Sequence, residues 1–288
     1  MIRSMTGYAR VERAGEWGRI SWEMRSVNHR YLDVLFKVPE EFRALESDLR
    51  VMAGARLSRG KIECALRYQR EVAPGERIDL DVNRMHQLRN ALDQLNAEFG
   101  ATTAPEPMRL LGYPGVVREE RADFAPLLAE ARSLFEEAIA QFSESRAGEG
   151  ARLAQFLLER CDALQVLVDQ LRARYPQVRD QWLERMQARC RDLGVEVEPQ
   201  RLAQEIVLTS QRLDIEEEMS RLVSHLQEVR QALGRSDAVG RRLDFLMQEL
   251  NREANTTSSK SQDAEMTRCA VDMKVIIEQM REQVQNIE

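Results

Sequence analysis

A near-heptad series of apolar residues in the middle of the chain constrains the fold more than any other feature. The steps between its members are four, four, three, four, three and four, through Leu153, Leu157, Cys161, Leu164, Val168, Leu171 and Tyr175. This spacing predicts a long helix that packs lengthwise against a partner helix. Pro176 should kink or end that helix. One chain need not cover so long an apolar stripe, so the series also favours a homo-oligomer.

The first 70 residues have a different period. Ile20, Trp22 and Met24 alternate with polar residues, and the segments 31–38 and 62–68 are similarly typical of strands. Between them, 40–57 has one apolar face at helical spacing. This order predicts an α+β fold: a small N-terminal mixed sheet with a covering helix, followed by a long, mainly α-helical C-terminal part.

The remainder of the chain divides at glycine and proline residues. We expect a short strand at 77–80, a helix at 82–99 and a loop rich in proline and glycine before residue 124. Gly148 and Gly150 should interrupt the helical part that follows, and three further helices are predicted at about 200–233, 239–256 and 262–285. The predicted domains are therefore 1–147 (α+β), 148–198 (a helical arm or linker) and 199–288 (helical).

Composition excludes several classes of protein. None of the apolar runs approaches the ~20 residues that cross a bilayer, and the first residues have no apolar core typical of a secretory signal. The four cysteines are scattered, which favours reduced thiols in the cytoplasm. The phosphate-binding loop and dinucleotide-binding motifs are missing. With only three histidines, a multi-histidine zinc site is excluded, so any bound metal needs carboxylate ligands, as Mg²⁺ or Mn²⁺ does.

Acidic residues gather on the predicted C-terminal helices. Asp214, Glu218 and His225 lie on one face of the first of them, together with Arg221. Glu249 and Glu253 lie one turn apart on the next helix. In an antiparallel hairpin these two faces would meet, and they could hold a divalent cation and a proton-transfer group. A solvated lattice of ion pairs is the alternative, although Asn251 and Asn255, which are poor helix formers, favour a site.

Basic residues gather near the N-terminus. Residues 1–70 carry 14 basic and 9 acidic residues, a net charge of +5, whereas the whole chain carries −6. The segment 25–31 combines arginines with Asn28, His29 and Tyr31, and Arg59 and Lys61 flank Gly60. These residue types contact phosphates and stack on bases. A turn with incidental charge is the alternative.

Several long motifs together resemble the YicC/YloC family. They are IRSMTGYAR, WEMRSVNHRYLD, RGKIEC, RRLDFLMQELNREANTTSSKS and REQVQNIE, with a weaker likeness from about 71 to 200. Arg242 stands where lysine is expected, which keeps the charge. The resemblance implies a bacterial cytoplasmic endoribonuclease that cuts single-stranded or structured RNA with a divalent metal and assembles as a homohexamer enclosing RNA. Other RNA-decay enzymes are candidate partners, and no membrane is expected.

Site residues are assigned on the stretches that carry these motifs. The predicted catalytic residues are His225, Glu249 and Glu253, and the predicted ligands of Mn²⁺ or Mg²⁺ are Asp214, Glu218, Glu249 and Glu253. The predicted RNA-binding residues are Arg25, Asn28, His29, Arg30, Arg59, Lys61, Arg241, Arg242, Arg252, Asn255 and Lys260. Two alternatives stay open. One is a metal-independent reaction in which His29 and His225 act as base and acid while the RNA 2′-hydroxyl attacks. The other is a non-catalytic RNA-binding adaptor that delivers RNA to another nuclease.

Overall fold

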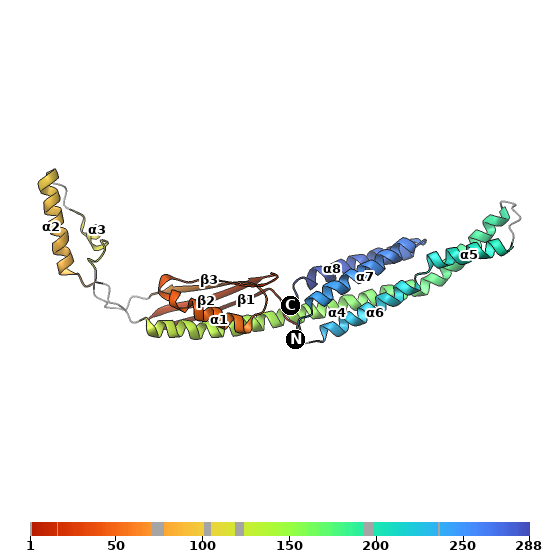
Figure 1. Ribbon diagram of the computed structural model, residues 1–288, viewed down its shortest axis with the longest axis horizontal. Helices are drawn as coiled ribbons and strands as arrows, with labels where there is room; N and C mark the ends of the chain where they lie inside the picture. The colour runs from red at the N-terminus through yellow and green to blue at the C-terminus, as the bar shows by residue number, and fades with distance from the viewer. Residues whose placement is uncertain are drawn as a thin grey trace.

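The computed structural model describes residues 2–15, 17–70, 78–100, 105–118, 124–192, 199–235 and 237–288. The molecule is elongated, with a four-stranded sheet in one half and a helical bundle in the other (Figure 1). One helix, α4 (Ala125–Asp192), runs through both halves. Each half has its own hydrophobic core. The predicted α+β class is confirmed.

The sheet contains β1 (Gly7–Gly15), β2 (Gly18–Val27), β3 (Leu32–Lys37) and β4 (Gly60–Gln69) in the order β1-β2-β4-β3. β3 and β4 are parallel and the other pairs are antiparallel, so the sheet is mixed as predicted. Strand β1 was not predicted. Its buried face consists only of Ala9 and Val11, which is too short a pattern to recognise beside the polar residues around it.

Helices cover one face of the sheet. The predicted helix at 40–57 is a 3₁₀ turn, η1 (Glu40–Leu45), followed by α1 (Glu46–Arg56). The first part of α4 also covers this face of the sheet, which the sequence patterns did not indicate. Phe135 of α4 packs on Trp22, and the Trp22 indole donates a hydrogen bond of 2.8 Å to the Ala131 carbonyl.

Helix α4 has 68 residues and is therefore about 100 Å long. It continues through Gly148, Gly150 and Pro176, so the predicted breaks are wrong. Pro176 lacks one backbone donor, but Tyr175 and Val178 beside it pack on the bundle core and hold the helix in place. Gly150 is needed for close packing: a Cβ there would clash with the Ile2 carbonyl. The predicted domain boundary near 148 stays a prediction.

The bundle consists of α4, α6 (Glu216–Leu233), α7 (Gly240–Lys260) and α8 (Ala264–Val284), with α5 (Pro199–Leu213) beside the outer end of α4. The near-heptad series packs into the bundle core here, with its two end members Leu153 and Tyr175 partly buried, so the predicted lengthwise packing is confirmed. Its partner helices belong to the same chain, however, and the series no longer argues for an oligomer. The predicted helix at 200–233 is interrupted at Asp214 and Ile215.

Both ends of the chain meet where the two halves join. Arg146 of α4 is 2% exposed and donates hydrogen bonds of 2.6 Å to the Ser4 carbonyl and to the Glu288 carboxylate. Burial lowers the pKa of the Arg146 guanidinium, and Glu288 opposes that shift. The Asn28 amide donates a hydrogen bond of 2.6 Å to the Gln285 carbonyl. These contacts fix the sheet to the bundle.

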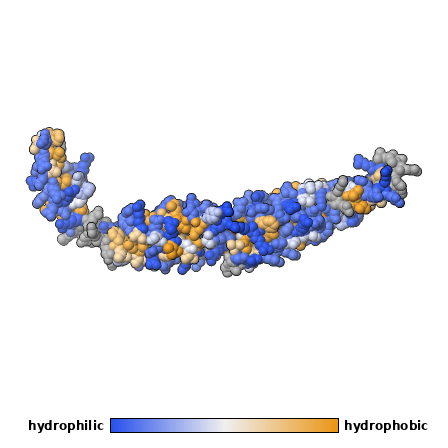
Figure 2. Space-filling view, viewed as in Figure 1, coloured by the Kyte–Doolittle hydropathy of each residue, from blue (hydrophilic) through white to orange (hydrophobic). Residues whose placement is uncertain are grey.

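A small arm projects from the far end of the sheet (Figure 1). It contains α2 (Val82–Phe99), as predicted, and α3 (Pro107–Leu111). The described part of the predicted strand at 77–80 does not form a strand: only Leu80 pairs, in an isolated bridge with Val117. Arg77 lies outside the described residues. Figure 2 shows hydrophobic patches at the tip of this arm, whereas the bundle is mostly hydrophilic on the visible face. In the part of the chain that is described, no helix combines the length and apolarity needed to span a membrane.

Candidate functional site

The candidate site lies on facing sides of α6 and α7. Each helix buries an apolar stripe in the bundle, which includes Leu222 and Leu226 in α6 and Leu246 and Leu250 in α7. The stripes fix the rotation of both helices about their axes. The polar side chains beside them are therefore held in defined positions, as a site requires.

His225, Glu249 and Glu253 converge as predicted. Ligand atoms of the three side chains, a ring nitrogen and two carboxylate oxygens, all lie within 4.8 Å of one another. The Glu253 side chain is 4% exposed, and those of Glu249 and His225 are 26% and 19% exposed. The buried Nδ1 of His225 has no hydrogen-bond partner among the described residues. This arrangement, which we call the α6–α7 cluster, lies near the middle of the hairpin.

Three charged residues border the α6–α7 cluster. Arg221 Nη1 lies 3.4 Å from Glu253 Oε1 and is also paired with Glu217. Arg252 Nη1 lies 4.0 Å from Glu249 Oε2. Glu228 Oε1 is 3.9 Å from His225 Nδ1. Glu228 was not singled out in the sequence, although it extends the α6 face by three residues beyond His225.

The other two predicted metal ligands do not join the α6–α7 cluster. The Glu218 carboxylate accepts a hydrogen bond of 2.7 Å from Lys260 Nζ. The same ammonium donates to the Asp214 carbonyl, and the Asp214 carboxylate accepts from the Glu216 backbone N–H at 3.0 Å. Lys260, predicted to bind RNA, thus ties the end of α7 to the start of α6. An ammonium group at this position takes the place that a cation would need.

The polar groups predicted for RNA on α7 lie beside the α6–α7 cluster. Arg252 and Asn255 line a surface cavity of about 420 Å³ together with Asn251, Thr256 and Arg281. The Asn255 amide donates to the Asn251 side-chain oxygen at 3.0 Å. Because Arg252 also faces Glu249, it connects this cavity to the cluster.

The predicted N-terminal RNA contacts gather at the junction of the two halves. Arg59 Nε donates a hydrogen bond of 3.1 Å to the His29 carbonyl, and the Arg30 guanidinium lies over the Tyr31 ring at 5.3 Å. Asn28 is engaged in the junction itself. His29 is therefore in the loop after β2, whereas His225 lies in the middle of α6, and the structure does not place the two histidines in one group.

The other predicted RNA contacts are exposed. Arg25 on β2 pairs with Glu23 and lies over the Tyr8 ring, and Lys61 is exposed at the start of β4. Arg241 and Arg242 begin α7 close to the junction, where Gly240 approaches the Ile287 carbonyl. Arg242 pairs with Glu228 at 3.3 Å.

Chemically, the α6–α7 cluster offers one imidazole and two carboxylates with arginines at its edge. Such a set can bind a hard or borderline cation, and an imidazole nitrogen without a partner can accept or donate a proton. The bordering arginines can contact a phosphate. Cation binding, proton transfer and phosphate contact are functions that metal-assisted hydrolysis of a phosphodiester uses.

Comparison with known proteins identifies the family of this chain. Residues 2–155 match the family model described as "Endoribonuclease YicC-like, N-terminal region", and residues 171–288 match "Endoribonuclease YicC-like, C-terminal". The chain is 41% identical over its full length to the "Probable endoribonuclease YicC" of Haemophilus influenzae, and 29% identical to the protein of the same name from Clostridioides difficile. Both relatives are covered over 100% of their length. The chain therefore belongs to the endoribonuclease YicC-like family.

Proposed function

We propose that this protein is an endoribonuclease that hydrolyses RNA phosphodiester bonds with a divalent cation held by His225, Glu249 and Glu253. The observation that carries the proposal is the convergence of these three side chains within 4.8 Å. All three lie in the segment matched by the C-terminal family model. The names of the relatives support RNA as the substrate.

The residues of the α6–α7 cluster fit a divalent cation. Two carboxylates and an imidazole suit Mn²⁺, and Mg²⁺ is commonly held by one or two carboxylates while it keeps several waters. The buried Nδ1 of His225 is one of four buried side-chain atoms without a hydrogen-bond partner among the described residues, so it is open to a ligand. A bound cation would polarise a phosphate oxygen and lower the pKa of a water molecule.

The chain's own residues then divide the remaining tasks. Glu253 is nearly excluded from solvent, so its carboxylate keeps a fixed position. His225 supplies one ring nitrogen to the cation in this arrangement, so that nitrogen does not also transfer a proton. Arg221 and Arg252 can pair with the phosphates on either side of the scissile bond, and the amide-lined cavity next to Arg252 can position the strand. The metal-independent alternative is less well supported, because it needs His29 beside His225.

The test is a cleavage assay with matched carboxamide variants. Glu249→Gln and Glu253→Gln should lower RNA cleavage at least about 100-fold while folding and RNA binding are retained, because an amide is a poor ligand for a hard cation. Glu218→Gln is the control, since it removes a buried carboxylate between the same helices that pairs with Lys260. Chelation should abolish cleavage, and added Mn²⁺ should restore it.

Three outcomes would contradict the proposal. Cleavage that survives chelation would favour the metal-independent reaction. Cleavage by Glu253→Gln within a few-fold of wild type would make that residue structural. Tight RNA binding without cleavage, with every metal tried, would favour the adaptor.

We also propose that the protein acts as a homo-oligomer, for which the family resemblance implies a hexamer. Support comes from the arm, where Phe99 is 80% and Met108 72% exposed and an apolar cavity of about 390 Å³ lies between α2 and α3. Uncovered apolar surface of this kind marks interaction sites. Light scattering should return a multiple of the 33.2 kDa chain mass, and Phe99→Ser with Met108→Ser should reduce that mass. A monomer of the wild-type protein at micromolar concentration would end this proposal.

A further inference from the structure

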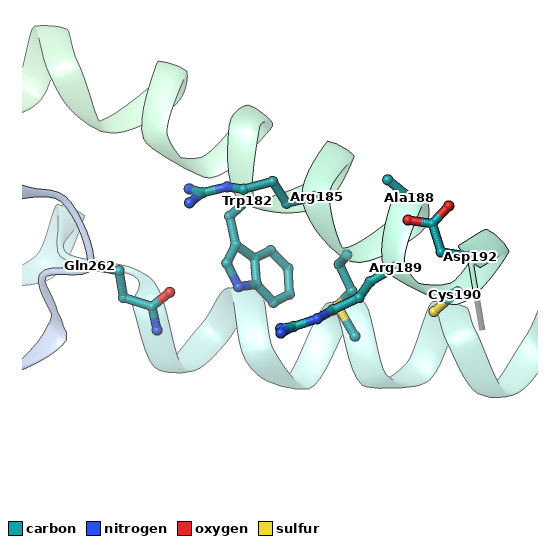
Figure 3. Close-up of a pocket in the computed structure, with 8 residues that line it drawn as sticks. Trp182, Arg185, Ala188, Arg189, Cys190, Asp192 and Gln262 are labelled. Carbon is teal, nitrogen blue, oxygen red and sulfur yellow. The ribbon is translucent and has the colours of Figure 1, made fainter.

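A second cavity lies at the outer end of the bundle, away from the α6–α7 cluster. Its volume is about 820 Å³, and it opens beneath the last turns of α4 (Figure 3). The described residues that line it are Trp182, Arg185, Met186, Ala188, Arg189, Cys190, Asp192 and Gln262. All but Gln262 belong to α4, and Gln262 lies in the turn between α7 and α8.

The lining combines an indole with two available guanidinium groups. Figure 3 shows Trp182 pointing from α4 into the cavity, with Arg185 and Arg189 on either side of it in this view. Neither arginine forms an ion pair with any carboxylate of the described residues, and the one contact of Arg185 is a hydrogen bond from its Nε to the Gln181 carbonyl. Most other arginines of the bundle are paired with acids, for example Arg174 with Asp263 and Arg230 with Asp162. Asp192 contributes one negative charge at the far end of the cavity.

This cavity is continuous with the end of α7. A narrow cavity shares Trp182, Arg185 and Gln262 with it and reaches Lys260. Lys260 lies seven residues after Glu253 on the same helix, which is about 10 Å along the axis. At about 3.4 Å per nucleotide along a helical strand, roughly three nucleotides would span that distance.

We propose that this cavity is a subsite for single-stranded RNA, in which Trp182 stacks on a base and Arg185 and Arg189 neutralise phosphates. This proposal rests on the proposed function and adds a place where the RNA strand is held a few nucleotides from the cleaved bond. An aromatic ring beside basic side chains binds single strands with little sequence preference, because every base has a face that can stack. The Gln262 amide, which faces the ring from the adjacent turn, can hydrogen-bond to a base edge.

The first experiment measures binding of a labelled ten-nucleotide RNA in EDTA, so that affinity is read separately from cleavage. Trp182→Ala should weaken binding about five- to 100-fold, the range expected for one stacked base. Arg185→Ala with Arg189→Ala should flatten the slope of log affinity against log salt by about 1.4, at about 0.7 for each lost phosphate contact. Arg191→Ala is the control for each of the two arginines replaced singly: like Arg185→Ala or Arg189→Ala it removes one charge from the last turns of α4, but Arg191 does not line the cavity.

A thiol on the cavity wall gives an independent measurement. Cys190 lines the cavity, Cys269 on α8 does not, and both are partly exposed. RNA should slow alkylation of Cys190 at least five-fold and leave Cys269 unchanged. Because Arg185 and Arg189 are exposed, their replacement tests the proposal even if Trp182→Ala does not fold.

Equal binding by the arginine variant and the control, with no protection of Cys190, would overturn the subsite. A changed oligomer mass with unchanged RNA affinity would overturn it too and would assign this surface to contacts between copies. Neither of these results bears on whether Glu249→Gln loses cleavage. Failure of the subsite can therefore be told apart from failure of the proposed function.

Discussion

Two groups of charged side chains in this molecule differ in how completely their buried charge is paired. At the junction of the sheet and the bundle, the Arg146 guanidinium donates to a carboxylate and to a carbonyl, both at 2.6 Å. In the α6–α7 cluster the Glu253 carboxylate is just as buried, but its nearest cation is 3.4 Å away and is shared with Glu217. The other groups that face it are a second carboxylate and an imidazole.

The difference separates a structural role from a binding role. A buried charge whose partners are all present adds to the contacts that hold elements together, and removing one partner is strongly destabilising. A buried acid that faces a second, partly exposed acid and an unpartnered nitrogen is unfavourable for folding alone, and such groups are common where a ligand binds. The first two of the following experiments compare the junction with the cluster.

The largest effect is expected at the junction. Arg146→Ala leaves the Glu288 carboxylate, whose side chain is 13% exposed, without its partner. The free energy of unfolding should fall by about 3–5 kcal/mol. Arg152→Ala, an exposed arginine on the same helix, should change it by less than about 0.5 kcal/mol. Urea denaturation measures both variants, and equal values would show that the junction pair is not structural.

The corresponding change in the cluster should have the opposite signature. Glu253→Gln removes one of two neighbouring acids, so the free energy of unfolding should stay within about 1 kcal/mol of wild type in the absence of metal. Cleavage should nevertheless fall at least about 100-fold. If this variant loses as much stability as Arg146→Ala, its pair with Arg221 is structural and the comparison fails.

Two helical glycines on α4 sharpen the account of the junction. A Cβ at Gly150 would overlap the Ile2 backbone, so Gly150→Ala should destabilise the protein by about 1–3 kcal/mol. At Gly148 a Cβ meets nothing within 4 Å, and Gly148→Ala should stabilise it by about 0.5–1 kcal/mol. Thermal unfolding of both variants distinguishes close approach of the chain end from simple helix propensity. Equal shifts would exclude the contact with Ile2.

A small effect is also expected at Asp263, an acid in an ordinary paired environment. A hydrogen bond from Arg174, with further ones from the first backbone N–H groups of α8, lowers the pKa of its carboxyl. Its contribution to stability is therefore complete above its unfolded pKa of about 3.9 and is lost as the pH falls through the lower folded value. Asp263→Ala should cost about 1 kcal/mol at pH 7. Asp263→Asn keeps the oxygen that caps α8 and should remove only the pH-dependent part of the contribution of Asp263 to the free energy of unfolding. Denaturation between pH 7 and pH 2 measures this part.

Local sequence patterns predicted those features of the site that depend on residues close to one another in the sequence. Helical spacing placed Glu249 beside Glu253, and the hairpin that brings them to His225 follows from the two apolar stripes. The junction was not predictable, because Arg146 and Glu288 are 142 residues apart and no period relates them. Lys260 was assigned to RNA for its charge, and only the packing of α6 on α7 shows that it pairs with Glu218.

The same reasoning explains the errors along α4. Gly150 and Pro176 usually mark the end of a helix, but tertiary contacts override that preference in a helix anchored in two cores. The near-heptad series correctly predicted a long packed helix. It could not show whether the partner helices come from the same chain.

Binding of a divalent cation by the α6–α7 cluster can be measured by titrating Mn²⁺ into the RNA-free protein and counting bound ions by electron paramagnetic resonance. We expect one Mn²⁺ per chain in wild type and in Glu218→Gln, and at least about ten-fold weaker binding in Glu253→Gln and in His225→Phe. Equal Mn²⁺ binding by all four proteins, or none by the wild type, would contradict this expectation.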